Sequence, residues 1–150
     1  MGDVEVWYAS GDRFLVRIRD HNLIIDQPLD EGGEDVGPTP TELFVAGLAA
    51  CVGFYAERFL RRHGLPAHDL RVRTSFELSK DRPARVASID LRVIVPAGLT
   101  SRQLEAMQAV VGHCTVHNSL RQPPEVRILL AEPEAPADRE IVAAGVSGGT

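Results

Sequence analysis

The chain has 150 residues, of which 44% are apolar and 25% are charged, and its formal net charge is -5. A chain of this length buries roughly 70% of its extended surface on folding, so a single domain can form a core without disulfides or a structural metal. The acidic balance argues against nucleic acid or anionic lipid as a partner, although 15 of the 16 cations are Arg. We therefore expect one soluble domain.

The N-terminal region predicts a small antiparallel sheet. Apolar residues alternate with other residues over Val4–Tyr8 and Phe14–Arg19, and Leu23–Ile25 can form a third strand. The first ten residues lack the basic and then apolar order of a secretory signal, so we expect a cytoplasmic protein. The acidic segment Gln27–Pro38 that follows is either a solvated connector or a flexible flap near a site.

A long central helix is predicted from Pro40 to His63. Thr39 can cap it, proline suits its first position, and Glu42 stands where a capping box requires an acidic residue. The run Leu43–Ala56 holds 14 apolar or glycine residues, fewer than the roughly 20 that a membrane span needs. We expect a buried helix that is enclosed on several sides at its start, and no membrane partner.

The second half of the chain predicts a long hairpin, a second helix and a last strand. Alternating residues over Leu70–Leu78 and Ala87–Val95 indicate the two arms of the hairpin. Thr100 and Gln103 repeat the capping-box pattern, and the helix they begin delivers Cys114 at its end. The predicted last strand lies at 126–130. We expect one domain over residues 1–131 and a weakly structured tail over 132–150.

The two cysteines carry the side chains of this sequence that are best suited to covalent chemistry. A cysteine on an apolar helix, such as Cys51, is most often a packing residue. A reactive thiolate at Cys51 lies too far from the helix start to be stabilised by the helix dipole, so it needs a cation. The arginines of the first strands, Arg13, Arg17 and Arg19, are available for this role.

Cys114 can be a buried thiol or one activated by a kink or a new helix start. A zinc site made of Cys51, His113, Cys114 and His117 is a further alternative, because zinc accepts sulfur and imidazole ligands. Their spacing matches no common zinc motif, so we expect no metal. The sequence also lacks the G-x-S-x-G, P-loop and G-x-G-x-x-G motifs, so no cofactor is expected.

The two cysteine segments together resemble a known family. The segment GPTPTELFVAGLAAC, which ends at Cys51, closely resembles the first-cysteine helix of the OsmC/Ohr family of osmotically induced and organic hydroperoxide resistance proteins. The segment HCTVHNSL, which begins at His113, resembles the second-cysteine motif of that family. The order of predicted elements also agrees, and the resemblance covers residues 3–130. Two separate motifs in the expected order make the resemblance specific, and within the family the chain resembles the OsmC-like branch.

The resemblance implies an α+β fold in which an antiparallel sheet wraps around a long central helix, within an intertwined homodimer. It also implies a thiol-dependent peroxidase of the stress response that reduces organic hydroperoxides. In that chemistry Cys51 is the peroxidatic cysteine, Cys114 resolves its sulfenic acid as a disulfide, and an external dithiol then reduces the disulfide. The alternative is a non-catalytic dimeric module that binds a small apolar ligand between its subunits.

The sequence departs from the family pattern at two places. In the hydroperoxide-resistance branch a catalytic Glu stands ten residues before the first cysteine, where this chain has Thr41. Glu42 follows one residue later, and it either orients an arginine or only completes the capping box. Arg13 is the best match to the activating arginine of the family. Thr115 stands where proline is common after the second cysteine.

Overall fold

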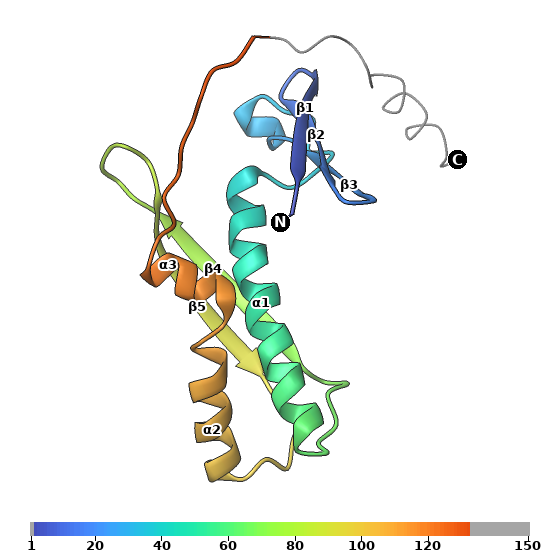
Figure 1. Ribbon diagram of the computed structural model, residues 1–150, viewed down its shortest axis with the longest axis vertical. Coiled ribbons are helices and arrows are strands. Elements are labelled where there is room, and N and C mark those ends of the chain that lie inside the picture. The colour runs from blue at the N-terminus through green and yellow to red at the C-terminus, as the bar shows by residue number, and fades with distance from the viewer. Residues whose placement is uncertain (1, 133–150) are drawn as a thin grey trace.

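The computed structural model describes residues 2–132, and these form two antiparallel sheets and three α-helices (Figure 1). The predicted tail over 132–150 lies outside the described residues, apart from its first residue. The elements in chain order are β1 (Val4–Ser10), β2 (Arg13–Ile18), β3 (His21–Ile25), the 3-10 turn η1 (Leu29–Glu31), α1 (Pro40–Arg62), β4 (Arg71–Leu78), β5 (Val86–Ile94), α2 (Ser101–Val111) and α3 (Thr115–Arg121).

The first sheet has the strand order β1-β2-β3, and one of its faces is apolar. Val6 pairs with Val16, which pairs in turn with Leu23, so these three side chains lie on the same face. Much of this face is open to solvent within the single chain: Val6 is 57% exposed and Tyr8 is 66% exposed. An apolar sheet face left uncovered in this way indicates a surface that packs against another molecule.

Both helix starts follow the predicted capping chemistry. The Thr39 hydroxyl accepts a hydrogen bond from the Glu42 backbone N–H, and the Glu42 carboxylate accepts one from the Thr39 N–H. Thr100 and Gln103 make the same reciprocal pair at the start of α2. Each capping box satisfies two backbone N–H groups that the first helical turn leaves unpaired, and it fixes where the helix begins.

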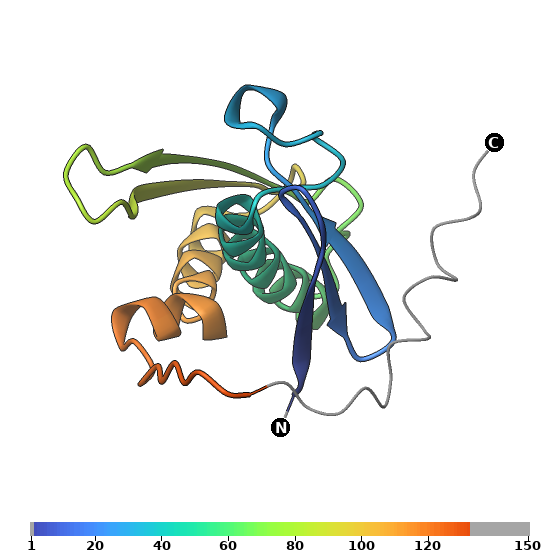
Figure 2. The same cartoon turned by 90° about the horizontal axis from the view of Figure 1, so that it is seen from above.

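The core is built around α1, which lies beside α2 and the β4–β5 hairpin (Figure 2). By length and composition, α1 is the one helix among the described residues that could cross a membrane, a test that the core helix of a soluble protein also passes. The buried residues of α1 pack with side chains from α2 and with the side chains of β4 and β5 that face the core. The fully or nearly buried members of this cluster are Leu48, Val52, Ala56, Phe59, Leu60, Met107, Val111 and Cys114.

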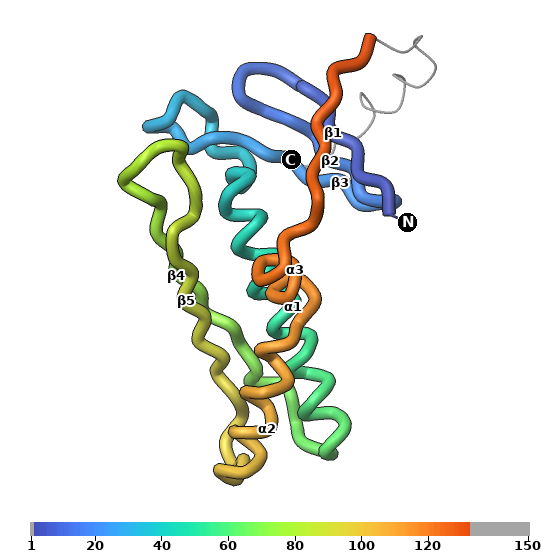
Figure 3. Tube along the Cα trace, turned by 60° about the vertical axis from the view of Figure 1, so that its left-hand side comes forward, coloured from blue at the N-terminus to red at the C-terminus, as the bar shows by residue number. Residues whose placement is uncertain are grey.

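Two expectations from the sequence are not met within one chain: the enclosure of the start of α1 and the formation of a last strand. The start of α1 is not enclosed, because Phe44 is 42% exposed, and Phe54 further along the helix is 67% exposed. The predicted last strand over 126–130 is also not formed: the chain leaves α3 as an extended segment without strand pairing (Figure 3). A strand requires a neighbour that supplies N–H and C=O groups, and none of the described strands pairs with this segment.

Candidate functional site

The fold brings the two cysteines together in the core. Cys51 lies in the middle of α1 and is partly exposed, whereas Cys114 is fully buried. Cys51 packs against the core cluster that contains Cys114, and it lies near enough to Cys114 to raise the pKa of that thiol. Both cysteines are free, so the pair is in the dithiol state. Two thiols that meet in this way can be joined as a disulfide by a two-electron oxidation.

Cys114 caps a new helix instead of ending the second one. The helix α2 stops at Val111, and α3 begins at Thr115 with Cys114 as its N-cap. The Cys114 sulfur accepts a hydrogen bond from the His117 backbone N–H at 3.4 Å. Burial raises the pKa of Cys114, and the neighbouring Cys51 raises it further, which together outweigh the hydrogen bond from His117. The Cys114 side chain is therefore a neutral thiol at neutral pH.

Arg13 is engaged by an acidic residue of the loop between β3 and α1. Its guanidinium lies 3.4 Å from the Glu34 carboxylate and forms an ion pair with it. The Glu42 carboxylate instead hydrogen bonds to the backbone N–H and the hydroxyl of Thr39, at 2.8 Å and 3.1 Å. Of the two roles left open for Glu42, its carboxylate takes the one in the capping box. In the described chain the partner of Arg13 is Glu34.

The loop that carries Glu34 is folded around one buried carboxylate. Asp26 is 1% exposed, and its oxygens accept hydrogen bonds from the backbone N–H groups of Gln27, Glu34 and Val36. Burial opposes ionisation of Asp26, but these three donors and the positive charge of Arg13 outweigh it and lower the pKa of Asp26. The segment predicted as a connector or a flap is thus a loop organised by Asp26.

Glycines allow this loop to close tightly. A Cβ at Gly33 would lie 2.0 Å from the Gln27 carbonyl oxygen, and one at Gly37 would lie 2.2 Å from the Ile24 carbonyl oxygen. No other residue tolerates such close approaches of backbone without a shift of the chain. The two glycines therefore let the loop return to β3 before α1 begins.

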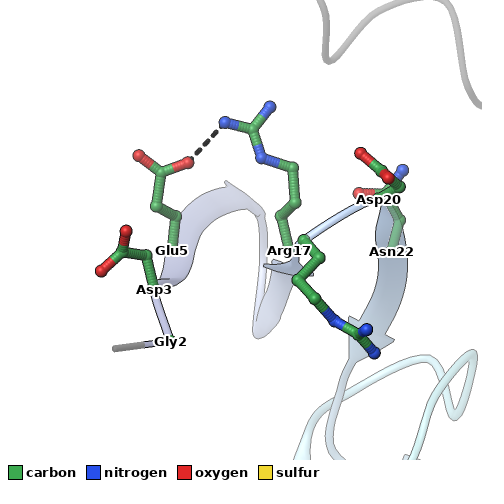
Figure 4. Close-up of a pocket in the computed structure, with 7 residues that line it drawn as sticks. Gly2, Asp3, Glu5, Arg17, Asp20 and Asn22 are labelled. Carbon is green, nitrogen blue, oxygen red and sulfur yellow. Dashed lines mark hydrogen bonds and ion pairs between the residues drawn. The ribbon is translucent and has the colours of Figure 1, made fainter.

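The other two arginines of the first sheet lie away from the cysteines. Arg17 donates a 2.6 Å hydrogen bond to Glu5 and stacks over Trp7, with 5.1 Å between its guanidinium carbon and the ring centroid. Arg17 and Arg19 line an open hollow on the polar face of this sheet, together with Asp20 (Figure 4). The hollow contains neither cysteine and no other nucleophile, so we do not locate the chemistry there.

The His117 ring bonds to the backbone at the end of α2. The His117 ring bonds through Nδ1 to the Gly112 carbonyl oxygen at 2.8 Å, while its backbone N–H bonds to Cys114. Within residues 2–132, no group of three or more His, Cys, Asp or Glu side chains is arranged to hold a metal ion.

An apolar groove runs between α1, β5 and α3. It is lined by Phe44 and Leu48 of α1, by Leu91 of β5 and by Leu120 of α3. The groove has a volume of about 290 Å³, and the His117 side chain is one of its few polar groups. A groove with this lining can accept an apolar chain or ring of modest size.

Comparison with known proteins agrees with this arrangement. The family model described as OsmC-like protein matches residues 32–129, a span that contains both Cys51 and Cys114. The chain belongs to the OsmC-like protein family. The expected α+β fold and the resemblance drawn from the two cysteine segments are thereby confirmed. No curated protein matches this OsmC-like chain.

Several solved structures share the OsmC-like fold. The chain is similar to an osmotic stress induced and detoxification response protein of Psychrobacter arcticus 273-4, at 20% identity over 79% of this chain and 88% of that one, with a TM-score of 0.72. It is similar to an organic hydroperoxide resistance protein of Legionella pneumophila, at 21% identity over 81% and 89%, with a TM-score of 0.63. It is also similar to an organic hydroperoxide resistance protein of Bacillus subtilis, at 20% identity over 82% and 92%, with a TM-score of 0.59.

Proposed function

We propose that this OsmC-like protein is a thiol-dependent peroxidase that reduces organic hydroperoxides. The observation that carries the proposal is the proximity of a partly exposed cysteine on α1, Cys51, to a buried one at the start of α3, Cys114. Membership of a family that includes organic hydroperoxide resistance proteins supports it. Such a pair can accept one oxygen atom from a peroxide and return to the dithiol state.

The exposure of the two thiols supports the roles proposed for them. Cys51 is the peroxidatic residue because its side chain is accessible, and Cys114 is the resolving residue because it is buried and protonated. The Cys51 thiolate attacks the terminal oxygen of the hydroperoxide and the O–O bond breaks. With one proton taken up, this gives an alcohol and a sulfenic acid on Cys51. The Cys114 thiol then displaces water from the sulfenic acid and forms the disulfide.

The cycle requires two further components. An external dithiol reduces the disulfide by thiol exchange, so that no bound cofactor is needed. A cation must also stabilise the Cys51 thiolate, and we keep Arg13 as that residue. Because Arg13 pairs with Glu34 in the single chain, either this ion pair exchanges partners or a second copy of the chain supplies the guanidinium.

The active form in this proposal is a homodimer. The apolar face of the first sheet, the exposed side of α1 and the unpaired segment at 126–130 all expose large apolar residues; Ile128 is 87% exposed and Phe54 is 67% exposed. A second copy of the chain can cover these surfaces and pair with the extended segment, as obligate dimers do. In such a dimer the extended segment becomes the expected last strand, and the second copy encloses the start of α1.

A stoichiometric reaction tests the peroxidase. Reduced protein is mixed with cumene hydroperoxide, and free thiols are titrated together with the cumyl alcohol formed. We expect two thiols to be lost for each alcohol in the wild-type chain, and no rapid alcohol formation by Cys51→Ser. Unchanged thiols in the wild-type chain would contradict the proposal.

A second candidate function rests on the apolar groove. A non-catalytic dimer could hold a small apolar ligand against Phe44 and Leu91, with the cysteines as packing residues. That function predicts that the Cys51→Ser, Cys114→Ser double variant binds an apolar dye as tightly as the wild-type chain, and that peroxide leaves the wild-type thiols intact. The thiol titration thus distinguishes the two functions directly.

A further inference from the structure

One hydrogen bond joins the two helices that carry the cysteines. The hydroxyl groups of Tyr55 on α1 and Thr115 on α3 lie 3.2 Å apart. Tyr55 follows Cys51 by four residues, which places both side chains on the same face of α1. Thr115 directly follows Cys114 and is the first residue of α3. The hydrogen bond therefore links the immediate surroundings of the two thiols.

The Tyr55 ring is held on two sides, so its hydroxyl has a defined position. The ring packs against the core cluster that contains Cys114. The guanidinium carbon of Arg58 lies 5.9 Å from the ring centroid, within range of a cation–π contact. A tyrosine restrained in this way loses little further freedom when its hydroxyl bonds to Thr115. The hydrogen bond can thus act as a fixed link between α1 and α3.

The helix α3 has few other anchors. It has seven residues, and none of them is buried. The chain that follows it is exposed, with Val126 at 74%. Apart from its Cys114 cap, α3 is held by the half-buried Val116, by the bond from the His117 ring to the Gly112 carbonyl oxygen, and by the Thr115 hydroxyl, which alone hydrogen bonds to a side chain of α1. A short helix held at so few points will shift when one of them is lost.

We propose that Tyr55 and Thr115 form a clamp that positions Cys114 against Cys51 for disulfide closure. A disulfide requires a sulfur–sulfur distance near 2.05 Å and Cα atoms within roughly 7 Å, so a small displacement of α3 opposes its formation. Both residues act through the thiols and are positioning residues, not catalytic ones. A role of the clamp in catalysis rests on the proposed peroxidase function. Its effect on the equilibrium between the dithiol and the disulfide does not.

The equilibrium between the dithiol and glutathione disulfide measures the clamp without any peroxide. In this reaction the two protein thiols lose two electrons and two protons, the Cys51–Cys114 bond forms, and one glutathione disulfide becomes two glutathiones. The variant Tyr55→Phe keeps the ring, its packing and the Arg58 contact, and it removes only the hydroxyl. The variant Thr115→Val removes the other hydroxyl at nearly constant shape, and Thr115→Ser restores one.

We expect Tyr55→Phe and Thr115→Val each to lower the equilibrium constant for disulfide formation by about two- to tenfold, the effect of one exposed hydrogen bond. The double variant should be no worse than either single variant, because both remove the same bond. Thr115→Ser should behave like the wild-type chain. Ser119→Ala is the matched control, because its hydroxyl bonds only within α3, to the Thr115 carbonyl oxygen at 3.0 Å.

An unchanged equilibrium in Tyr55→Phe and Thr115→Val would overturn the clamp, as would an equal effect of Ser119→Ala or additive effects in the double variant. These outcomes are separate from the fate of the proposed peroxidase. If the chain consumes hydroperoxide but its disulfide equilibrium is unchanged when either hydroxyl is removed, only the clamp is overturned. A chain whose equilibrium responds as expected but that consumes no hydroperoxide supports the clamp and overturns the peroxidase.

Discussion

The Arg13 guanidinium lies 3.4 Å from the Glu34 carboxylate, and this ion pair connects the start of β2 to the loop that leads into α1. Glu34 in turn is fixed through its backbone N–H, which donates to the buried carboxylate of Asp26 at 3.1 Å. The position of Arg13 therefore depends, through Glu34, on the Asp26 carboxylate. The Arg13 guanidinium makes no hydrogen bond to Asp26 itself. This relationship makes the role of Arg13 testable through its partner.

The first prediction concerns Arg13. We expect Arg13→Ala to slow the reaction of Cys51 with cumene hydroperoxide by at least about tenfold, which corresponds to roughly 1.4 kcal/mol of transition-state stabilisation. The reason is the loss of the cation that opposes the cost of a thiolate in apolar surroundings. Stopped-flow kinetics of the reduced protein measure the rate. If the rate is unchanged, the activating cation is another arginine, and Arg17 and Arg19 are the next variants.

The second prediction concerns Glu34. We expect Glu34→Gln to slow the same reaction by a smaller factor, about two- to fivefold, because Arg13 remains but loses the charge that orients it. Glu31→Gln removes an equal charge from the same loop and serves as the control, since Glu31 is exposed. An equal loss in both variants would mean that only the net charge of the loop matters. A faster reaction in Glu34→Gln would mean that Glu34 withholds Arg13 from the thiol.

The third prediction separates the two cysteines. We expect Cys51→Ser to abolish peroxide consumption, because the remaining Cys114 thiol is fully buried and its pKa is raised. Cys114→Ser should permit one oxidation event and then leave Cys51 open to conversion to sulfinic acid. Mass spectrometry of each variant after peroxide exposure distinguishes these products. Identical behaviour of the two variants would contradict the assigned roles.

The fourth prediction concerns the oligomeric state. We expect light scattering during size-exclusion chromatography to give the mass of a dimer, because α1 and the first sheet expose large apolar residues. Phe54→Glu should weaken or abolish the dimer by placing a charge on a surface that a second copy covers. Arg62→Glu, at the exposed end of the same helix, is the control. A folded wild-type monomer at low concentration would contradict this prediction.

Much of the fold could be predicted from the sequence because its signals are local. The capping boxes at Thr39 and Thr100 fixed two helix starts to the residue, since the chemistry of a capping box lies within four consecutive residues. Alternation over the strands predicted the meander and the hairpin for the same reason. The contact of the two cysteines followed from the family resemblance, because nothing local in either segment indicates that Cys51 and Cys114 meet.

The missed features depend on residues far apart in the sequence. The role of Asp26 arises from three backbone N–H groups, two of which lie eight and ten residues further along the chain. The ion pair of Arg13 with Glu34 spans 21 residues. The last strand was expected from alternation alone, but pairing needs a neighbouring strand, which a single chain does not provide here. A hint was present in Asp26 itself, a carboxylate at the end of an apolar strand before a glycine-containing loop.

The fifth prediction concerns Asp26 and the dependence of stability on pH. Because the folded chain lowers the pKa of Asp26, the ionised carboxylate stabilises the fold at pH values above its unfolded pKa. This contribution is lost as the pH falls through the lower, folded pKa. We expect Asp26→Asn to lower the melting temperature at neutral pH, because the two carboxylate oxygens that accept from Gln27 and from Glu34 and Val36 are replaced by one amide oxygen and an NH2 group that cannot accept a hydrogen bond.

The same variant should also flatten the pH profile. Between about pH 5 and pH 2 the melting temperature of the wild-type chain should fall more steeply than that of Asp26→Asn, because only the wild-type chain must protonate this buried group. Asp30→Asn removes a charge from the same loop at an exposed position and should leave the slope unchanged. Parallel profiles for the wild-type chain and Asp26→Asn would mean that the Asp26 carboxylate is not what holds the loop, and the ordered position of Glu34 beside Arg13 would then need another source.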